Sequence, residues 1–497
     1  MANGGIIGTV NNPTSSTATG VWQQEEQYEA VRDGTWPQRA LFTTKSLRFN
    51  SGSSDYLTFT PSATPTGSAK TWTYSVWAKM AKENPGYFLA AGSGTQSKFI
   101  FGAYGGGDID ILTYEGYVIA ANTARLFRDP SAWYHVVLAC DTTQAVAANG
   151  IKLYINGVQQ TLSFNSIGGQ NGYTQNTSLR VGTSGEPINI GKDINDSGYW
   201  NGYIAESILV DGQQLAPTSF GVANSDGVWT PIIYTGTFGT NGFNLQFENS
   251  AALGTDSSPN GNTFTANNLT SIDQSTDYPE VNFATWSPLY GGNSQYATFS
   301  EGNLKLAGNN ASNAGTNLNS TVAASSGKYY MEVKALDIQG NSYPAVGVIM
   351  EDDVYVSLGQ VGGNTNSVSY SPNGQKNIGG TASSYGNSFT DNDIIGIALD
   401  LDNGAVYFSK NGTFQASGNP TSGSSRTNAA YTFTASSKLY FFAATVYQTT
   451  SILSANFGSA PYAISSGNTD ANGYGNFEYA VPSGYYSLNT KNLGEFG

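Results

Sequence analysis

The stretch 391–414 constrains the fold more than any other part of the sequence. It reads DNDIIGIALDLDNGAVYFSKNGTF, and its first half alternates between two sets of side chains, Ile395, Ile397, Leu399 and Leu401 against Ile394, Gly396, Ala398 and Asp400. In a β-strand this alternation turns one set toward a core and the other outward. Asn403-Gly404 and Asn411-Gly412 are suited to the positive φ angles of tight hairpin turns. The stretch therefore predicts a three-stranded antiparallel meander.

A looser version of the same pattern lies about one domain length earlier. It consists of WYHVVLACD from Trp133, a loop ending in Asn149-Gly150, IKLYI from Ile151 and a turn at Asn156-Gly157. Charged residues make up 11% of the chain, against roughly a quarter in an average protein. Helix formers are scarce, whereas 60 of the 497 residues are glycine. We expect an all-β protein with two β-sandwiches in series.

Charge and cysteine usage exclude several classes of protein. Counts of 21 Lys and Arg against 35 Asp and Glu give a formal charge of −14, which repels phosphate backbones and anionic membrane surfaces. No apolar run approaches the roughly 20 residues that span a bilayer. We therefore expect neither nucleic-acid binding nor membrane insertion. The single cysteine, Cys140, excludes an intrachain disulfide and a cysteine-rich metal site, and its strand position predicts a core thiol.

The chain divides into four parts by composition. Residues 1–40 form a Gly, Asn, Ser and Thr-rich segment that ends in one credible helix, Gln24–Arg32, and lacks the features of a signal peptide. The first sandwich is expected at 41–250, a turn-rich linker at 251–287 and the second sandwich at 288–493. The aromatic rings around the short helix cannot be buried by it alone, so they pack either on the next domain or on a partner protein.

Two family resemblances follow from ordered motifs. SLRF from Ser46, WTYSVWAK from Trp72, WYHV from Trp133, KLYINGV from Lys152 and GYIAESILVDGQ from Gly202 together resemble a laminin-G, concanavalin A-like domain. The resemblance implies a jelly-roll sandwich of two antiparallel sheets. Its members mostly bind glycans or proteins, often with calcium, and a minority hydrolyse polysaccharides.

The second half resembles the SPRY family, which is also a two-sheet sandwich. The motifs are GKYYMEV from Gly327, the 391–414 meander and SANFG from Ser454. Met331 departs from the family pattern, because an aromatic residue is common at that position. The resemblance implies a SPRY-like sandwich after the laminin-G-like one.

The wider arrangement is similar to phage virion structural proteins, especially those of marine and cyanobacterial viruses. The similar pieces are the MANGGIIG start, GVWQQEEQYEAVRDGTWP from Gly20, GTNGFNLQF from Gly239 and GYYSLNTKNL from Gly484. The resemblance implies that the N-terminal segment docks on the virion and that the sandwiches are displayed. The docking residues expected on this basis are Trp22, Glu25, Tyr28 and Trp36.

Catalytic chemistry has little support in the sequence. His135 is the only histidine, and it alternates with Trp133 and Val137 inside a strand, so we expect a structural role. Asp108 and Asp110 share a strand face, but a retaining glycosidase needs a nucleophile and an acid/base about 5 Å apart, and no glutamate flanks them at that spacing. We expect no catalytic residues and no enzyme.

Two acidic runs and several loop aromatics are candidates for metal and ligand sites. Asp400, Asp402 and Asn403 supply the oxygen ligands that calcium takes, and so does the run 351–353, yet Asp-Asn-Gly is also a common turn sequence. We expect no resident cofactor and no resident metal. The cation that these oxygen ligands would suit is calcium. Aromatic rings in polar loops are suited to stacking on sugars, and the candidate ligand-binding residues are Tyr104, Tyr173, Tyr199, Trp200 and Tyr385.

These observations predict a non-enzymatic virion structural and adhesion protein, resembling a tail fibre or a capsid decoration. It would be assembled in the host cytoplasm and exposed outside the cell. Its expected partners are other virion proteins and host surface glycans. We also expect a homo-oligomer, and a trimer is the first choice. The alternatives are a purely structural cement protein without a host ligand and a polysaccharide depolymerase.

Overall fold

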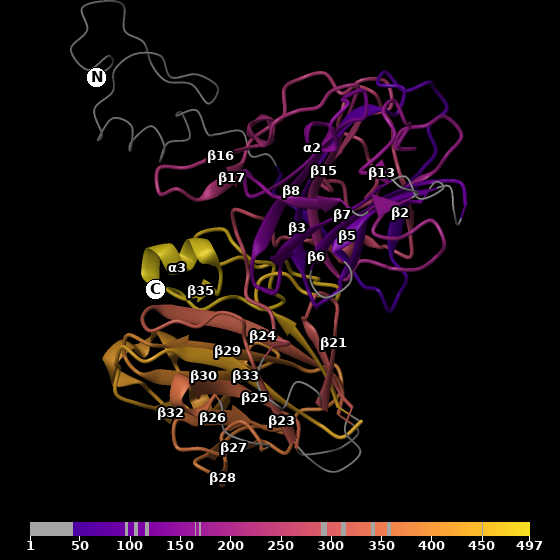
Figure 1. Ribbon diagram of the computed structural model, residues 1–497. Coiled ribbons are helices and arrows are strands. Elements are labelled where there is room, and N and C mark those ends of the chain that lie inside the picture. The colour runs from indigo at the N-terminus through magenta and orange to yellow at the C-terminus, as the bar shows by residue number, and fades with distance from the viewer. Residues whose placement is uncertain are drawn as a thin grey trace, which may run out of the picture.

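The computed structural model describes residues 43–497 except 95–97, 104–107, 115–118, 165, 168–169, 290–295, 310–314, 339–342, 355–358 and 450. The described part is almost entirely β-structure, arranged as two sandwiches in series (Figure 1). Its α-helices are the short segments α2 (Ala147–Gly150) and α3 (Thr490–Phe496). No described helix is long and apolar enough to cross a bilayer.

The first sandwich consists of two large antiparallel sheets. One has the order β10-β9-β8-β3-β15-β1-β20 with β18 added to β15, and the other has the order β11-β7-β6-β5-β4-β14-β2-β19. In chain order its strands are β1 (Ser46–Phe49), β2 (Tyr56–Phe59), β3 (Thr71–Met80), β4 (Gly86–Gly92), β5 (Lys98–Ala103), β6 (Asp108–Tyr114), β7 (Ile119–Leu126), β8 (Trp133–Asp141), β9 (Ile151–Ile155), β10 (Val158–Gln159), β11 (Leu162–Phe164), β14 (Ile188–Ile190), β15 (Gly202–Asp211), β18 (Phe243–Leu245), β19 (Thr265–Asn267) and β20 (Gln274–Ser275). Two short hairpins complete it, β12 (Ser166–Ile167) with β13 (Gln170–Asn171) and β16 (Gly221–Ala223) with β17 (Trp229–Pro231).

Strand periodicity correctly identified the core of this sandwich. Trp72, Tyr74 and Val76 of β3 all enter the same apolar cluster. Cys140 is fully buried beside Leu138 on the same face of β8. Burial of these large side chains, each stabilising by about 1.5–3 kcal/mol, holds the two sheets together.

The segment 251–287, expected as a linker, contributes two strands to the first sandwich. β19 pairs with β2 and β20 pairs with β1. A buried carboxylate fixes the start of the segment, since Asp256 accepts hydrogen bonds from the backbone N–H groups of Asn244 (2.8 Å), Ser258 (2.8 Å) and Asn262 (2.7 Å). The turn formers that suggested a linker therefore build a fixed loop.

The second sandwich also has two antiparallel sheets. The larger has the order β21-β22-β34-β24-β29-β30-β31, with β32 on β30 and β35 on β24, and the smaller has the order β23-β33-β25-β26-β27-β28. Its strands are β21 (Ala297–Ser300), β22 (Lys305–Gly308), β23 (Gly315–Asn319), β24 (Lys328–Asp337), β25 (Ala345–Met350), β26 (Ser367–Tyr370), β27 (Gln375–Ile378), β28 (Thr381–Ser384), β29 (Ile394–Asp400), β30 (Ala405–Lys410), β31 (Thr413–Phe414), β32 (Tyr431–Thr432), β33 (Tyr440–Tyr447), β34 (Ile452–Asn456) and β35 (Tyr486–Ser487).

The meander predicted at 391–414 is confirmed as β29, β30 and β31. One turn differs in detail. Asn411 and Gly412 both have positive φ, at 47° and 78°, but of the Asn403-Gly404 pair only Gly404 does, at 66°. Asp400 holds that longer turn instead, because its Oδ1 accepts the backbone N–H of Asn403 at 3.0 Å.

The second face of the meander is covered, although the alternation predicted that it would face outward. All seven residues of β29 are buried. Ala398 lies in a separate apolar cluster with Tyr330, Phe477 and Tyr485. The C-terminal segment after β34 therefore lies across the outer face of this sheet and ends in α3, on the side that faces the first sandwich (Figure 1).

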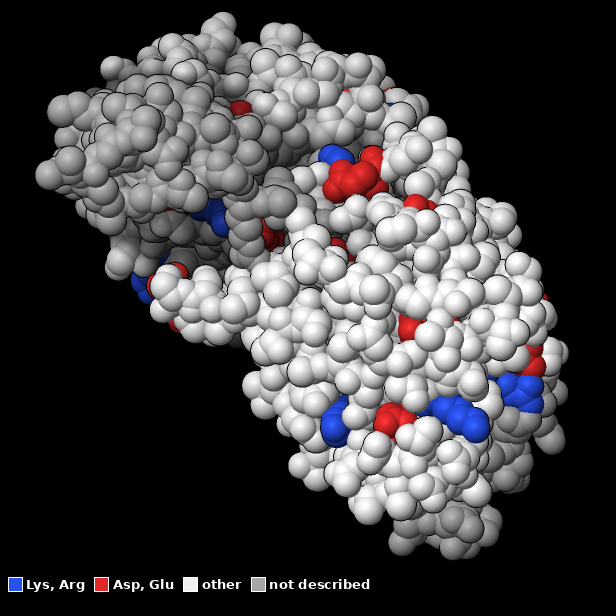
Figure 2. Space-filling model, turned by 90° about the horizontal axis from the view of Figure 1, so that it is seen from above, with Lys and Arg blue, Asp and Glu red and all other residues white. Residues whose placement is uncertain are grey.

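Charged side chains are sparse on the face drawn in Figure 2. In the view of Figure 2, Lys, Arg, Asp and Glu form small separate spots on a face made otherwise of uncharged residues. No broad basic patch lies on this view of the described part.

Candidate functional site

A buried ion pair anchors the segment that leads from the first sandwich to the second. Lys79 of β3 and Asp277 are each 1% exposed, with Nζ 2.8 Å from Oδ2. The same ammonium donates to Asn282 Oδ1 (2.7 Å) and to the carbonyl oxygen of Phe283 (2.9 Å), and Asp277 Oδ1 accepts from Trp133 Nε1 (3.0 Å). Burial raises the pKa of Asp277, and the Lys79 ammonium opposes that rise. The pair fixes the segment 277–283 on the outer face of the first sandwich.

A second buried cation lies nearby. Arg48 of β1 is fully buried, and its Nη2 donates to the carbonyl oxygen of Ile272 at 2.8 Å. Its Nε lies 3.4 Å from a carboxylate oxygen of Glu301, which belongs to the turn between β21 and β22 of the second sandwich. This ion pair therefore joins the two sandwiches directly.

The turn 301–303 makes two further contacts across the junction. The hydroxyl of Tyr203 donates to the carbonyl oxygen of Gly302 at 3.0 Å, and Asn303 Nδ2 donates to the carbonyl oxygen of Ala81 at 2.6 Å. Both bonds are buried, where an unpaired polar group would cost about 1–3 kcal/mol. Together with the ion pairs they hold the sandwiches in one relative orientation.

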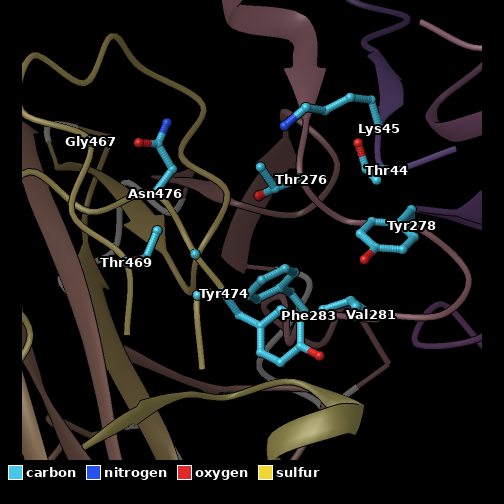
Figure 3. Close-up of a pocket in the computed structure, with 12 residues that line it drawn as sticks. Thr44, Lys45, Thr276, Tyr278, Val281, Phe283, Gly467, Thr469, Tyr474 and Asn476 are labelled. Carbon is cyan, nitrogen blue, oxygen red and sulfur yellow. The ribbon is translucent and has the colours of Figure 1, made fainter. Parts of the chain in front are cut away.

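A cleft of about 510 Å³ opens at this junction (Figure 3). Residues just before β1, the segment after β20 and the C-terminal segment line it: Thr44, Lys45, Thr276, Tyr278, Val281, Phe283, Gly467, Thr469, Gly473, Tyr474, Gly475 and Asn476. In Figure 3 Lys45 and Tyr278 lie on one side, Thr469 and Asn476 on the other, and Tyr474 on the floor with Phe283. The volume falls within the range of about 300–1,000 Å³ that small-molecule sites occupy.

One buried carboxylate holds the glycine-rich loop of the cleft. Asp470 Oδ1 accepts the backbone N–H groups of Asn472 (3.0 Å) and Tyr474 (2.9 Å). Its Oδ2 accepts the backbone N–H of Ser487 (2.9 Å), the Ser487 hydroxyl (2.6 Å) and Nδ2 of Asn492 (2.9 Å). The loop is thereby tied to β35 and α3, so Tyr474 is held in place before any ligand arrives.

A second carboxylate anchors the other end of the loop. Glu332 of β24 is fully buried and accepts the backbone N–H groups of Glu478 (2.9 Å) and Tyr479 (2.8 Å). The hydroxyl of Tyr330 and Nδ2 of Asn456 also donate to it, at 3.2 and 3.3 Å. Burial raises the pKa of Glu332, and these donors counter the rise.

The side chains around the cleft retain unused polar groups. Within the described part of the chain, the Lys45 ammonium, the Tyr278 and Tyr474 hydroxyls and the side chains of Thr469 and Asn476 have no hydrogen-bond partner. Burial, together with negative groups nearby, raises the pKa of Tyr278 to about 12 and also raises that of Tyr474. Both phenols stay protonated at neutral pH, so each offers a ring face and a hydroxyl donor.

The ligand-binding residues expected from the sequence lie outside this cleft. Trp200 is fully buried against Phe88, with ring centroids 4.5 Å apart. Tyr173 is 7% exposed, and its hydroxyl lies 3.2 and 3.1 Å from the carbonyl oxygens of Asp141 and Gln144. Both rings belong to the core of the first sandwich and present no face to a ligand.

Two other candidates are half-buried and far apart in the fold. Tyr199 lies beside Tyr56 in the first sandwich, with centroids 6.3 Å apart. Tyr385 packs edge-on against Tyr370 of the second, at 5.6 Å. Tyr104 and the docking residues Trp22, Glu25, Tyr28 and Trp36 lie outside the described residues.

His135 of β8 is fully buried between two indole rings. It stacks on Trp77 at a centroid distance of 4.7 Å and on Trp229 at 6.1 Å. Trp229 Nε1 donates to His135 Nδ1 at 2.9 Å, so the ring proton is on Nε2, which lies 2.9 Å from Ser75 Oγ. Burial lowers the pKa of the imidazole to about 3. These contacts give the ring a structural role.

The acidic runs weighed as cation sites are engaged within the fold. Asp400 is buried, accepts from Asn403 and lies 3.3 Å from Lys328 Nζ. Glu351 and Asp352 pair with Lys438 at 3.2 and 3.0 Å. Among the described residues no group of three or more His, Cys, Asp and Glu side chains is placed to hold a metal ion.

Asp108 and Asp110 lie on β6, between β5 and β7. Asp108 is paired with Leu126 and Asp110 with Asn122, and the β6–β7 register shifts between these two pairs. The placement of their side chains lies outside the described part of the structure.

Sequence reasoning missed the two tyrosines of the cleft. Tyr278 lies in a run of turn formers that suggested a linker, and Tyr474 lies in NTDANGYGN without any periodicity. The available signal was local, because each is a single aromatic residue next to glycine or proline in an otherwise polar segment. Nothing in the sequence indicates that segments almost 200 residues apart meet.

Comparison with known proteins identifies both sandwiches. Residues 51–213 match the concanavalin A-like lectin/glucanases superfamily, in its Laminin_G_3 family, and residues 328–460 match the SPRY domain. No curated protein matches the sequence significantly.

Three solved structures are similar to parts of the chain. The SPRY domain of human HERC1 is 17% identical, with 31% of this chain and 87% of that chain covered and a TM-score of 0.24. A human SPRY domain is 18% identical, with coverage of 32% and 94% and a TM-score of 0.25. Stonustoxin is 17% identical, with coverage of 35% and 27% and a TM-score of 0.26, so the match spans about a quarter of that protein.

The family matches agree with the order of motifs in the sequence and with the two sandwiches of the structure. The pair of domains indicates a binding or structural role. The chain carries a concanavalin A-like domain followed by a SPRY domain.

Proposed function

We propose that this chain is a non-enzymatic virion structural and adhesion protein. In this proposal the N-terminal segment 1–40 docks on the particle, and the two sandwiches form an exposed recognition unit. The virion assignment rests on the resemblance of the N-terminal, middle and C-terminal motifs to phage structural proteins. Other virion proteins and host surface glycans are the proposed partners.

The observation that carries the recognition role is the rigid junction of the two sandwiches. Lys79, Asp277 and Arg48 are buried there in ion pairs, and the turn 301–303 is hydrogen-bonded across it. A rigid tandem unit suits display on a particle, because many identical copies then present their sites in one orientation. Weak single contacts multiply when sites are linked in this way.

The absence of enzymatic activity is part of the proposal and has its own support. The only histidine of the chain is stacked between Trp77 and Trp229 and uses Nδ1 to accept an indole N–H, so it is not free to transfer a proton. Three of the buried carboxylates, Asp256, Glu332 and Asp470, accept backbone N–H groups of the loops around them. Each is engaged in holding a loop.

A cryo-EM map of intact particles of the virus that encodes this chain tests the proposal. The expected result is density for residues 1–40 against the capsid or tail, with both sandwiches projecting outward in a symmetric oligomer, a trimer in the simplest case. Sandwiches clamped between neighbouring subunits would establish the cement role and refute adhesion. Absence of the chain from purified particles would refute the virion assignment and favour the depolymerase.

A further inference from the structure

The cleft at the junction has the chemistry of a saccharide site. Tyr278 and Tyr474 supply apolar ring faces, and Lys45, Thr469 and Asn476 supply uncommitted donors and acceptors. A sugar presents both C–H faces and hydroxyl groups, and it uses both kinds of contact at once. A purely apolar ligand would leave the ammonium and the amide without partners, which is unfavourable in a partly desolvated site.

The charges around the cleft favour a neutral sugar over an acidic one. Glu248 accepts the backbone N–H of the cleft-lining Thr44 at 2.6 Å, and Glu495 accepts from Nδ2 of Asn472, next to the cleft-lining Gly473, at 3.0 Å. Lys45 is the cation lining the described part of the cleft. A sialylated or sulfated ligand would bring its own negative charge toward these carboxylates, and like charges repel at such range.

The loop that carries Tyr474 is set before binding. Asp470 and Glu332, both buried, accept backbone N–H groups on either side of it. Across the cleft, the Lys79–Asp277 pair fixes the segment that leads to Tyr278. A site whose two walls are already ordered avoids the loss of loop and side-chain freedom on binding, which otherwise reduces affinity.

We propose that a neutral oligosaccharide binds in this cleft, between Tyr278 and Tyr474. The site exists only where both sandwiches and the segment between them meet, so neither sandwich alone would hold it. The inference rests on the proposed recognition role and adds to it a place and a ligand class. It places the site away from Tyr199 and Tyr385.

Binding to the full chain tests the inference. The probes are maltotriose, cellotriose, mannotriose and chitotriose, with sialyllactose as the acidic comparison, measured by isothermal titration calorimetry. At least one neutral trisaccharide is expected to bind more tightly than sialyllactose. Tyr474→Ala and Tyr278→Ala are each expected to weaken that binding by about tenfold, the change that corresponds to about 1.4 kcal/mol.

Matched variants separate the site from general damage to the fold. Tyr199→Ala removes a half-buried tyrosine outside the cleft and is expected to leave binding unchanged. Tyr474→Phe keeps the ring and loses the hydroxyl, and Lys45→Gln removes the ammonium at a half-buried position; both are expected to weaken binding while the melting temperature stays that of the parent chain.

Three results would overturn the inference. They are binding that survives every cleft variant, binding that is lost in Tyr199→Ala, and the absence of binding to all four neutral probes. Each leaves the virion assignment to be decided by the particle map. Conversely, if a neutral sugar binds and the variants behave as expected, the inference about the cleft holds even if the particle map shows a cement protein.

Discussion

Removing the buried ammonium of Lys79 should loosen the junction between the sandwiches. Lys79→Met keeps most of the side-chain volume but deletes the donor to Asp277, Asn282 and Phe283. It leaves the Asp277 carboxyl buried with Trp133 as its remaining side-chain donor. Removing one partner of a buried pair typically costs about 3–5 kcal/mol, and we expect a loss of that size.

The pH dependence of this loss identifies its cause. Burial already raises the pKa of Asp277, and the ammonium is the largest influence that opposes the rise. In the variant the pKa rises further, so the folded state holds a proton that the unfolded state releases. Stability then falls as pH rises from acid toward neutral. The deficit relative to the parent chain is therefore expected to be larger at pH 8 than at pH 5.

Urea unfolding followed by tryptophan fluorescence, with calorimetry alongside, measures both effects. Lys79→Met is expected to unfold at a lower urea concentration than the parent chain, because the segment 277–283 loses its donor while the contacts of Arg48, Tyr203 and Asn303 across the junction remain. Adding Asp277→Asn to Lys79→Met should recover part of the loss. Lys152→Met, at a half-buried lysine whose ammonium donates to Gln214, serves as control and should change stability by less than about 0.5 kcal/mol. A loss below about 1 kcal/mol in Lys79→Met, or one independent of pH, would refute the reasoning.

Three further predictions concern single buried groups. The pKa of His135 is about 3 in the folded chain and about 6.5 in the unfolded chain. The contribution of the neutral imidazole to the free energy of unfolding is therefore complete above pH 6.5 and is lost as pH falls toward 3. The loss reaches about 2 kcal/mol at pH 5; His135→Gln should remove this component of the pH–stability curve, and an imidazole NMR signal titrating near pH 6.5 in the folded chain would contradict it. Asp470→Ala should leave several buried donors unpaired and lower the free energy of unfolding by about 3 kcal/mol. Hydrogen exchange should become faster at 468–478 and stay unchanged in the first sandwich. An equal increase in exchange in both regions would count against a local role. Asn489→Ala removes the N-cap of α3, which accepts from the backbone N–H groups of Lys491 and Asn492, and should cost about 1 kcal/mol by urea unfolding, whereas no loss would show that α3 needs no cap.

Strand alternation and turn chemistry predict much of this fold because they are local. The meander at 391–414 and the core faces of β3 and β8 follow from period-two alternation. The order of motifs then indicates the two sandwich families. None of this requires knowledge of which distant segments meet.

The covered faces and the cleft could not be predicted, because they depend on contacts between segments that are far apart in the sequence. Ala398 looks outward-facing until the C-terminal segment, with Phe477 and Tyr485, is placed over it. Tyr278 and Tyr474 come together only through the pairing of long-range segments, and that pairing leaves no local pattern. Asp470 and Glu332 fix the loop of Tyr474 by accepting backbone N–H groups, and the sequence alone does not show which N–H groups these are.

Isolated aromatic residues in polar runs were the least reliable signal. Trp200 and Tyr173 occur among glycine and asparagine, as a ligand-binding loop would have them, yet both rings fill the core. A single ring has no periodicity, so the sequence around it does not distinguish a buried ring from an exposed one. The two cleft tyrosines occur in the same kind of run and line the cleft.

A crystal structure of the full chain soaked with the tightest-binding trisaccharide of the neutral panel tests the central claim most directly. The account predicts sugar density at the junction of the sandwiches, in contact with the rings of Tyr278 and Tyr474, and a loop at 467–476 unchanged from the free protein. Density at Tyr199 or Tyr385, or an empty junction in a crystal that binds the sugar elsewhere, would contradict it.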